Sequence, residues 1–401
     1  MAKSSNYQSK KIQLNRKVIL FSLSIILFAM TLRTPLTVVG PITSFIRDGL
    51  GISNVLAGFL TTIPLLAFAV VSPFAPRIAQ RFGMEWTLFY SLLLLVAGIV
   101  LRSLGTTSLL LLGTVLIGIA ISFGNVLIPS FFKMRYPLHI GILTGIYTVS
   151  MNLSSGFAAG ISYSVATATN WQMALGIAIL AAIIGIIFWI PQLREEKVAL
   201  TGSTSKGNGW GMLIRSPIAL AVMVAMGMQS FLFYTMAAWI PEIYIAQGID
   251  ANHAGWLISI MQFGQIPMTF LTPIVAAKMT NQRPIVLMFS AFYLLGFTGV
   301  LMEWTNYAFL WMIFLGFAGG ASFSLSMMFF TLRTTTAYEA AELSGFAQSI
   351  GYLLAAIGPT CFGLLHDVTD NWFVPNIIFI VIAISLAVAA YIASSNRTIH
   401  D

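Results

Sequence analysis

The chain is 401 residues long, 58% of its residues are hydrophobic and only 8% are charged, against about 25% charged residues in an ordinary soluble domain. This composition excludes a water-soluble globular protein and predicts an integral membrane protein. The net charge of +8 does not indicate nucleic-acid binding, because the basic residues fall mostly in alternate short loops. The single cysteine, Cys361, excludes an intramolecular disulfide, and the four histidines are far apart in the sequence. We therefore expect neither a metal site nor a cofactor.

Twelve apolar runs are long enough to cross the hydrocarbon core of a bilayer, which takes about 20 residues in a helix. They lie at 17–46, 53–75, 86–104, 108–132, 140–166, 172–191, 217–246, 252–277, 284–302, 306–331, 340–366 and 372–394. A polar stretch rich in Gly and Ser separates the sixth run from the seventh. The sequence thus predicts an all-α membrane protein with twelve transmembrane helices. Its parts are a tail (1–16), an N-terminal six-helix half (17–193), a linker (194–215), a C-terminal six-helix half (216–395) and a second tail (396–401).

The orientation follows from the basic residues. Of the 20 Lys and Arg residues, Arg47 and Arg102 fall on the side opposite the termini and Arg33 falls within a span, which leaves seventeen on the side of the termini. Lys and Arg concentrate on the cytoplasmic side of membrane proteins. We therefore expect a multi-pass protein of the plasma membrane with both termini in the cytoplasm.

The two halves resemble each other. Pro41 and Pro241 are expected to end the first helix of each half, AGFL at 57–60 corresponds to AGWL at 254–257, and LTG at 143–145 corresponds to LSG at 343–345. Gly118 and Gly316, and Arg135 and Arg333, form two further pairs, and all offsets lie between 197 and 200. Parallel repeats of six helices are typical of the major facilitator architecture, in which a solute binds near mid-membrane between the halves.

Arg33 is the residue that most needs an explanation. It lies in LRTPLTVVGP (32–41), within the first apolar run and roughly 20–25 Å from each end of it at 1.5 Å per residue. A charge at the bilayer centre costs roughly 2.5 to more than 10 kcal/mol. Arg33 could extend to an interface or pair with a structural carboxylate, but no Asp or Glu lies in the middle of a predicted span. We expect Arg33 to face the central cavity and to bind the negative oxygens of a solute.

Polar and aromatic residues at middle depth are candidates for the cavity wall. Any of the amides could instead hold helices together, and the aromatic residues could simply pack. The candidates are Thr37, Asn125, Tyr147, Asn152, Gln229, Tyr234, Trp239, Gln262, Gln265, Gln348 and Tyr352. Arg77, Arg81 and Gly83, in the turn after the second run, are either topology signals or parts of a gating loop. Glu242 and His366, near the outer ends of their helices, are possible proton sites.

Four stretches together carry a family resemblance. They are LRTPLTVVGP (32–41), GNVLIPSFFKMRYP (124–137), QSFLFYTMAAWIP (229–241) and ELSGFAQSIGYLLAAIGPTCFGLLHDVT (342–369). On these residues the chain resembles the cyanate permease and 2-nitroimidazole transporter branch of the major facilitator superfamily. The resemblance implies a carrier for a small anion or polar heterocycle, in which Arg33 matches the arginine of the first helix. The loop APRIAQRFGMEW keeps Arg81 and Gly83 of the superfamily signature but departs from it elsewhere.

The leading hypothesis is a secondary active or facilitative transporter of a small anionic or polar nitro/heterocyclic solute that works by alternating access, with Arg33 as the anchor. Two alternatives are a proton-coupled efflux pump that uses Glu242 or His366, and a membrane sensor that binds a solute without moving it. Enzyme motifs and a Walker A sequence are missing, so we expect neither catalysis nor direct use of ATP. The expected partners are the solute and the bilayer, with no nucleic acid, and we expect a monomer.

Overall fold

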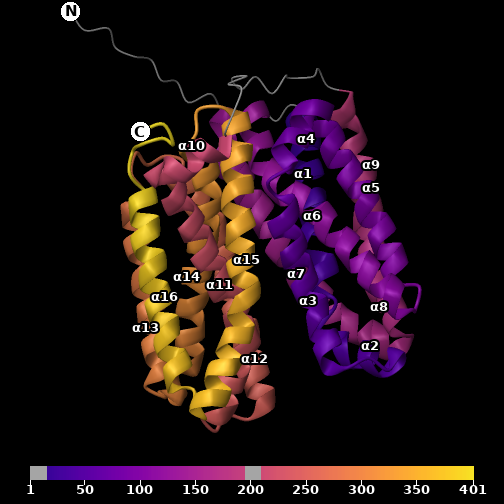
Figure 1. Cartoon of the computed structure of the whole chain (residues 1–401), viewed down its shortest axis with the longest axis vertical. Coiled ribbons are helices and arrows are strands. Elements are labelled where there is room, and N and C mark those ends of the chain that lie inside the picture. The colour runs from indigo at the N-terminus through magenta and orange to yellow at the C-terminus, as the bar shows by residue number, and fades with distance from the viewer. Residues whose placement is uncertain (1–15, 195–208) are drawn as a thin grey trace, which may run out of the picture.

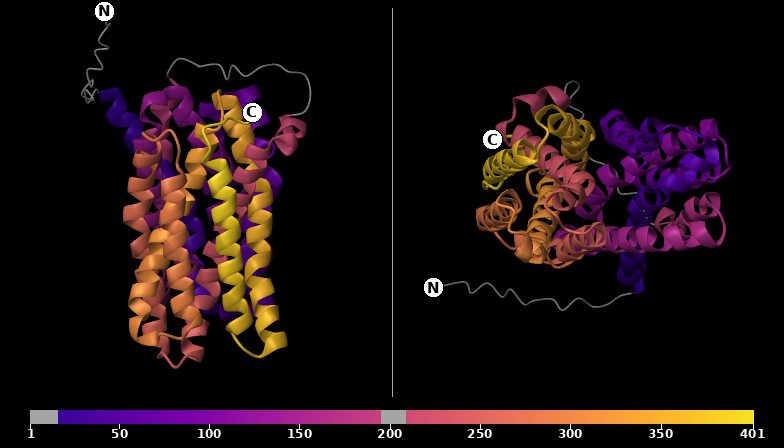
Figure 2. Two further views of the ribbon diagram at one scale, coloured as in Figure 1. Left: turned by 90° about the vertical axis from the view of Figure 1, so that its left-hand side faces the viewer. Right: turned by 90° about the horizontal axis from the view of Figure 1, so that it is seen from below.

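The structure, a computed structural model, describes residues 16–194 and 209–401, and every element in these ranges is a helix. The predicted N-terminal tail, apart from Arg16, and most of the predicted linker lie outside the described residues. The helices form two bundles that stand side by side (Figures 1 and 2). α4 (Ala75–Phe82), α10 (Gly209–Arg215) and the C-terminus lie at one end of both bundles, called the linker end below. α2 (Thr43–Leu50) and α8 (Trp171–Gly176) lie at the opposite end.

The N-terminal bundle runs from one end to the other six times, and each run is called a pass below. Besides α2, α4 and α8, its elements are α1 (Arg16–Thr37), η1 (Gly40–Ile42), α3 (Asn54–Val71), α5 (Met84–Arg102), α6 (Thr107–Arg135), η2 (Pro137–His139), α7 (Ile140–Ala168) and α9 (Ala178–Leu193). The C-terminal bundle also contains six. They are α11 (Pro217–Ala246), α12 (Ala251–Ala276), α13 (Arg283–Leu301), η3 (Thr305–Tyr307) with α14 (Ala308–Leu332), α15 (Ala337–Thr369) and α16 (Phe373–Ala393).

By length and composition, ten helices of the described residues can cross a membrane, or eleven if α3 and α4, bent by 61°, count as one span. α7 is 29 residues long and carries no charged side chain, but it is rich in Ser and Gly. At 1.5 Å per residue it is longer than the hydrocarbon core is thick. With α7 the passes number twelve, and the predicted all-α membrane fold is confirmed.

The proline prediction is wrong for Pro241, and Pro41 marks an interruption of the first helix instead of the end of its pass. The first helix ends at Thr37, before Pro41, and the same pass continues through η1 and α2 to Leu50. Proline lacks an N–H and its ring clashes with the carbonyl four residues earlier, which accounts for the interruption just before Pro41. Pro241 ends nothing, since α11 runs past it to Ala246. Within a membrane, neighbouring helices can satisfy the backbone groups that a proline frees.

The internal repeat appears as repeated packing. A Cβ added to Gly118 would lie 2.9 Å from the Pro64 Cα in α3, and one added to Gly316 would lie 2.4 Å from the Met261 oxygen in α12. In each half, therefore, the fourth pass contacts the second through a glycine. Between the halves, Gly145 of α7 approaches the Phe270 oxygen of α12, and Gly345 of α15 approaches the Ser72 oxygen. The fifth pass of each half thus contacts the second pass of the other.

Arg135 and Arg333 also occupy equivalent positions. Arg135 Nη2 lies 2.5 Å from Glu85 Oε1 at the start of the third pass, in a pair whose side chains are only 11% and 7% exposed. Arg333 donates to Gln282, directly before the third pass of its own half. Each half therefore ties the end of its fourth helix to the beginning of its third at the linker end.

Candidate functional site

A cavity of about 700 Å³ lies between the two halves. The N-terminal half contributes residues of α1, η1, α3, α5 and α7 to its wall, and the C-terminal half contributes residues of α11, α12 and α15. The wall carries two charged residues, Arg33 and Arg102, and no Asp or Glu of the described residues. Gly40 and Phe59, which are exposed nearer the opposite end, also line the cavity. The cavity therefore extends toward the opposite end and carries positive charge.

Arg33 is held by aromatic rings of the other half. It lies in the last turns of α1, directly before the break at Thr37. Its guanidinium carbon lies 5.1 Å from the ring centroid of Phe233 in α11 and 5.4 Å from that of Phe323 in α14. Such cation–π contacts contribute about 0.5–2 kcal/mol each, depending on how dry the site is. Among the described residues no carboxylate forms an ion pair with Arg33, which lines the cavity.

The structure divides the predicted wall residues into two groups. Thr37, Tyr234, Trp239 and Gln262 line the cavity with Arg33. Trp239 is fixed by a 2.8 Å hydrogen bond from its indole N–H to the Pro359 oxygen. The Gln262 amide oxygen accepts a 2.8 Å hydrogen bond from Gln265, which is itself buried.

A second group lies outside the cavity wall and connects helices. Asn125 accepts a 3.3 Å hydrogen bond from the Tyr147 hydroxyl within the N-terminal half, and its backbone oxygen accepts one of 3.1 Å from Gln348 of α15. Asn152 donates to the Thr269 hydroxyl of α12 at 3.3 Å. The bonds of Gln348 and Asn152 thus connect the two halves outside the cavity wall.

Gln229 and Tyr352 are also buried outside the wall. Gln229 is 2% exposed and accepts a 3.4 Å hydrogen bond from Ser230. The Tyr352 ring packs edge-on against Phe68 of α3, with 4.9 Å between the ring centroids.

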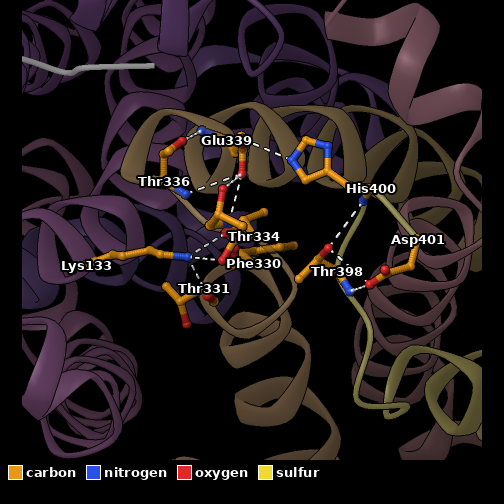
Figure 3. Close-up of polar contacts among 10 residues, drawn as sticks. Lys133, Phe330, Thr331, Thr334, Thr336, Glu339, Thr398, His400 and Asp401 are labelled. Atoms are coloured by element: carbon orange, nitrogen blue, oxygen red, sulfur yellow. Dashed lines mark hydrogen bonds and ion pairs between the residues drawn. The ribbon is translucent and has the colours of Figure 1, made fainter. Parts of the chain in front are cut away.

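The linker end of the interface is closed by hydrogen bonds between the halves. Lys133, near the end of α6, donates to the Thr331 oxygen at 2.8 Å and to both the backbone oxygen and the hydroxyl of Thr334 (Figure 3). Ser349 of α15 donates to the Ala69 oxygen of α3 at 2.5 Å. Lys133 was expected only to orient the chain in the membrane. Its acceptor Thr331 lies 198 residues further along the chain, so no local sequence pattern indicates the contact.

The C-terminal residues pack against the same turn after α14. Ile399, 3% exposed, donates its N–H to the Arg333 oxygen at 2.9 Å. His400 lies 3.1 Å from Glu339 (Figure 3). Glu339 also closes a capping box with Thr336 at the start of α15. Burial lowers the pKa of Arg333, which lies just beyond the spanning part of α14, to about 10, so Arg333 stays charged at neutral pH.

The predicted gating and proton residues lie away from the cavity. Arg77 and Arg81 belong to α4 at the linker end, and Gly83 takes a φ of +89° between α4 and α5, where a residue with a side chain would be strained. Glu242 is exposed on α11. His366 packs on the Trp372 ring, with 4.2 Å between the ring centroids.

Arg102 is a wall residue that sequence reasoning missed. It was assigned to the outer surface, but its side chain is 1% exposed and its Nη1 donates to the Pro35 oxygen of α1 at 2.7 Å. Its position at the end of an apolar run is equally typical of a loop residue. Metal binding has no support in the described residues, where no group of three His, Cys, Asp or Glu side chains could hold an ion.

Known proteins resemble the chain over nearly its whole length. The uncharacterized transporter YycB of Bacillus subtilis (strain 168) is 43% identical and aligns over 96% of this chain and 97% of its own. The 2-nitroimidazole transporter of Escherichia coli (strain K12) is 36% identical and aligns over 94% of this chain and 95% of its own. The cyanate transport protein CynX of the same organism is 25% identical and aligns over 87% of this chain and 91% of its own.

The fold also matches solved structures. The proton:xylose symporter XylE superposes with a TM-score of 0.77 at 13% identity, covering 96% of this chain and 98% of the symporter, a likeness that shows the fold alone. A sequence model of the Major Facilitator Superfamily matches residues 19–359. The chain is therefore a membrane transporter, not an enzyme, and it belongs to the major facilitator superfamily.

Proposed function

We propose that this transporter moves a small anionic or polar nitro/heterocyclic solute by alternating access, as a secondary active or facilitative carrier, with Arg33 as the substrate anchor. One observation carries the proposal. Arg33 lies in the wall of the cavity between the halves, and no carboxylate among the described wall residues neutralises it. The natural partner of such a cation is an anion or a group with negative oxygens that arrives with the solute.

The chemistry of the wall supports a flat solute. The guanidinium is a planar fork that suits carboxylate-like and nitro-like oxygens. Phe233, Tyr234 and Trp239 offer rings beside it, and Thr37 and Gln262 offer hydrogen-bonding groups. Two of the relatives are named for 2-nitroimidazole and for cyanate, which are small, polar and rich in electron-bearing heteroatoms.

The contacts between the halves support alternating access. Lys133 and Ser349 connect the halves at the linker end, while the cavity extends toward the opposite end. All basic residues of the described ranges except Arg33, Arg47 and Arg102 lie at the linker end or near it, which supports placing that end and both termini in the cytoplasm of a plasma-membrane protein. The cavity is then open to the outside.

The inner gate would include the contacts of α4. α4, which carries Arg77 and Arg81, packs against α15 of the other half, which supports a gating role for Arg77, with Arg81 and Gly83 shaping the same turn. The proton-coupled alternative assigns the proton to Glu242 or His366, both outside the cavity wall. An imposed pH gradient across liposomes distinguishes coupled from uncoupled movement.

The test combines binding and flux on the purified full-length chain, taken as a monomer. A thermal-shift screen with cyanate, 2-nitroimidazole and nicotinate is followed by liposome uptake of every compound that raises the melting temperature. We expect Arg33→Gln to remain folded and to lose at least tenfold in affinity, because the anchor charge is gone. Arg47→Gln, which removes an exposed cation already paired with Asp48 at 2.9 Å, is the control and should bind normally.

Two results would contradict the proposal. If folded Arg33→Gln bound and transported as well as the wild type, Arg33 would not be the anchor. If the wild type bound a compound but sealed vesicles showed no flux, the protein would act as a sensor.

A further inference from the structure

Arg102 is a second cation of the cavity wall with an unusual environment. It ends α5, at the opposite end of the N-terminal half, and its side chain is 1% exposed. It lines the same cavity as Arg33. A guanidinium cannot lose its charge at neutral pH, so burial of Arg102 places a permanent positive charge beside the solute space.

Only part of this guanidinium is satisfied by the protein. Nη1 donates to the Pro35 oxygen at 2.7 Å, one of the last four carbonyls of α1, which have no partner within their own helix. Nε and Nη2 are buried and have no hydrogen-bond partner among the described residues. Buried polar groups in native proteins are nearly always hydrogen-bonded, so an unmatched pair of charged N–H groups calls for an explanation.

Capping of α1 explains Nη1 but not the other two nitrogens. A cation at the end of a helix is favourable, yet one N–H group is enough for the Pro35 oxygen. Nε and one Nη of a guanidinium are the pair that forms parallel hydrogen bonds to a carboxylate. The unmatched pair on Arg102 therefore has the geometry and charge to bind two oxygens of an anion.

We propose that Arg102 is a second substrate-binding residue and that the solute is a small planar anion whose charge is shared by two oxygens, such as a carboxylate. This inference rests on the proposed function and narrows it, because a neutral heterocycle could accept hydrogen bonds from Nε and Nη2 but would leave the buried charge of Arg102 without a counter-charge. Arg102 also holds the oxygen of Pro35, two residues after Arg33. Anion binding at Arg102 and the position of Arg33 are thereby connected through the end of α1.

The test uses nicotinate and nicotinamide, which share one ring and differ in a carboxylate against a neutral amide. Dissociation constants for both are measured on the purified full-length wild type, Arg102→Gln and Arg102→Lys, with Arg47→Gln as a control for the general loss of a positive charge on this side. We expect the wild type to prefer nicotinate. Arg102→Gln should lose at least tenfold in nicotinate affinity with nicotinamide affinity unchanged within twofold, and Arg47→Gln should match the wild type.

Arg102→Lys keeps the charge and can still reach the Pro35 oxygen, but it lacks the paired donors. It should therefore lose several-fold in nicotinate affinity, and it replaces Arg102→Gln as the test if that variant does not fold. A role in capping alone would lower the melting temperature and weaken both probes alike.

The other results of these binding measurements distinguish failure of the Arg102 site from failure of the proposed transport function. An unchanged preference for nicotinate in a folded Arg102 variant overturns the second site and leaves the carrier function intact. Equal wild-type affinity for both probes overturns anion selectivity, again without touching transport. A wild type that binds neither probe, nor cyanate nor 2-nitroimidazole, and shows no flux overturns the proposed function and this inference with it.

Discussion

The charged residues of this chain separate by whether the protein supplies a partner. Arg33 and Arg102 lie in the cavity wall without an acid among the described residues, whereas Glu85 and Arg135 are buried together at 2.5 Å. The indole N–H of Trp189 also donates to the Glu85 backbone oxygen at 3.0 Å, so Glu85 connects three passes of the N-terminal half. The pair of Glu85 and Arg135 thus belongs to the scaffold, whereas Arg33 and Arg102 belong to the cavity wall.

This difference makes a stability prediction about Glu85. Glu85→Ala leaves the Arg135 charge buried without its carboxylate, which costs about 3–5 kcal/mol. Asp48→Ala removes the partner of Arg47 in a pair whose side chains are 40% and 68% exposed, which costs at most about 1 kcal/mol. Apparent melting temperatures of the two variants in the same detergent check the prediction. Equal decreases in melting temperature would mean that the ion pair of Glu85 and Arg135 does not stabilise the fold more than the exposed pair does.

Part of the site was predictable at the scale of single residues. Arg33 was identifiable because a charge within an apolar run is costly, and Thr37, Tyr234, Trp239 and Gln262 also line the cavity. The roles of these residues in binding stay predictions. Depth along a helix indicates neither its rotation nor its neighbours, so Asn125, Asn152 and Gln348 were equally good candidates and instead connect helices. Arg102 was missed because its burial depends on the end of α1 reaching α5.

At the scale of helices, existence and order were predictable from apolar length, but interruptions were not. The break after Thr37 and the 61° bend between α3 and α4 both affect helices that line the cavity. Pro41 and Pro241 hold corresponding positions in the internal repeat, yet one follows a break and the other lies inside α11. Packing by neighbouring helices decides whether a proline interrupts its helix, and the sequence of one helix does not reveal that packing.

Close approach of helices does give a prediction at this scale. Gly316→Ala would place a methyl group 2.4 Å from the Met261 backbone oxygen, so α12 and α14 must separate, at a cost of about 1–3 kcal/mol. Gly156→Ala on α7 meets nothing within 4 Å and should be neutral or slightly stabilising, since alanine favours a helix by about 1 kcal/mol over glycine. Melting temperatures and the monodisperse fraction on size exclusion measure both. A fall with Gly156→Ala as large as that with Gly316→Ala would show that the contact is not responsible.

At the scale of the whole molecule, the two halves are built alike but the two ends of their interface differ. The pairs Gly118 with Gly316 and Gly145 with Gly345 make equivalent contacts, and these follow from the internal repeat of the sequence. The closed linker end does not follow from the repeat. A repeat specifies which helices can meet, whereas hydrogen bonds such as those of Lys133 join the two halves at the linker end.

The last prediction concerns the equilibrium between the state closed at the linker end and the state closed at the opposite end. Lys133→Met removes charge-assisted hydrogen bonds, each contributing about 1.5–3 kcal/mol, from the state closed at the linker end. Since about 1.4 kcal/mol changes a population ratio tenfold, the fraction of molecules with the cavity open to the opposite end should fall. A cysteine at Gly40, where the structure leaves open space, reports this state through a membrane-impermeant maleimide, with Cys361 replaced by Ser.

We expect Lys133→Met to slow labelling of that cysteine several-fold, while Lys278→Met, which removes an exposed lysine at the linker end, leaves the rate unchanged. A solute that binds the open cavity should restore part of the rate in Lys133→Met, because a ligand shifts the equilibrium toward the state it prefers. Unchanged labelling in Lys133→Met would mean that closure is held by helix packing at Gly345 and Ser72, and the lysine would then have only its topological role.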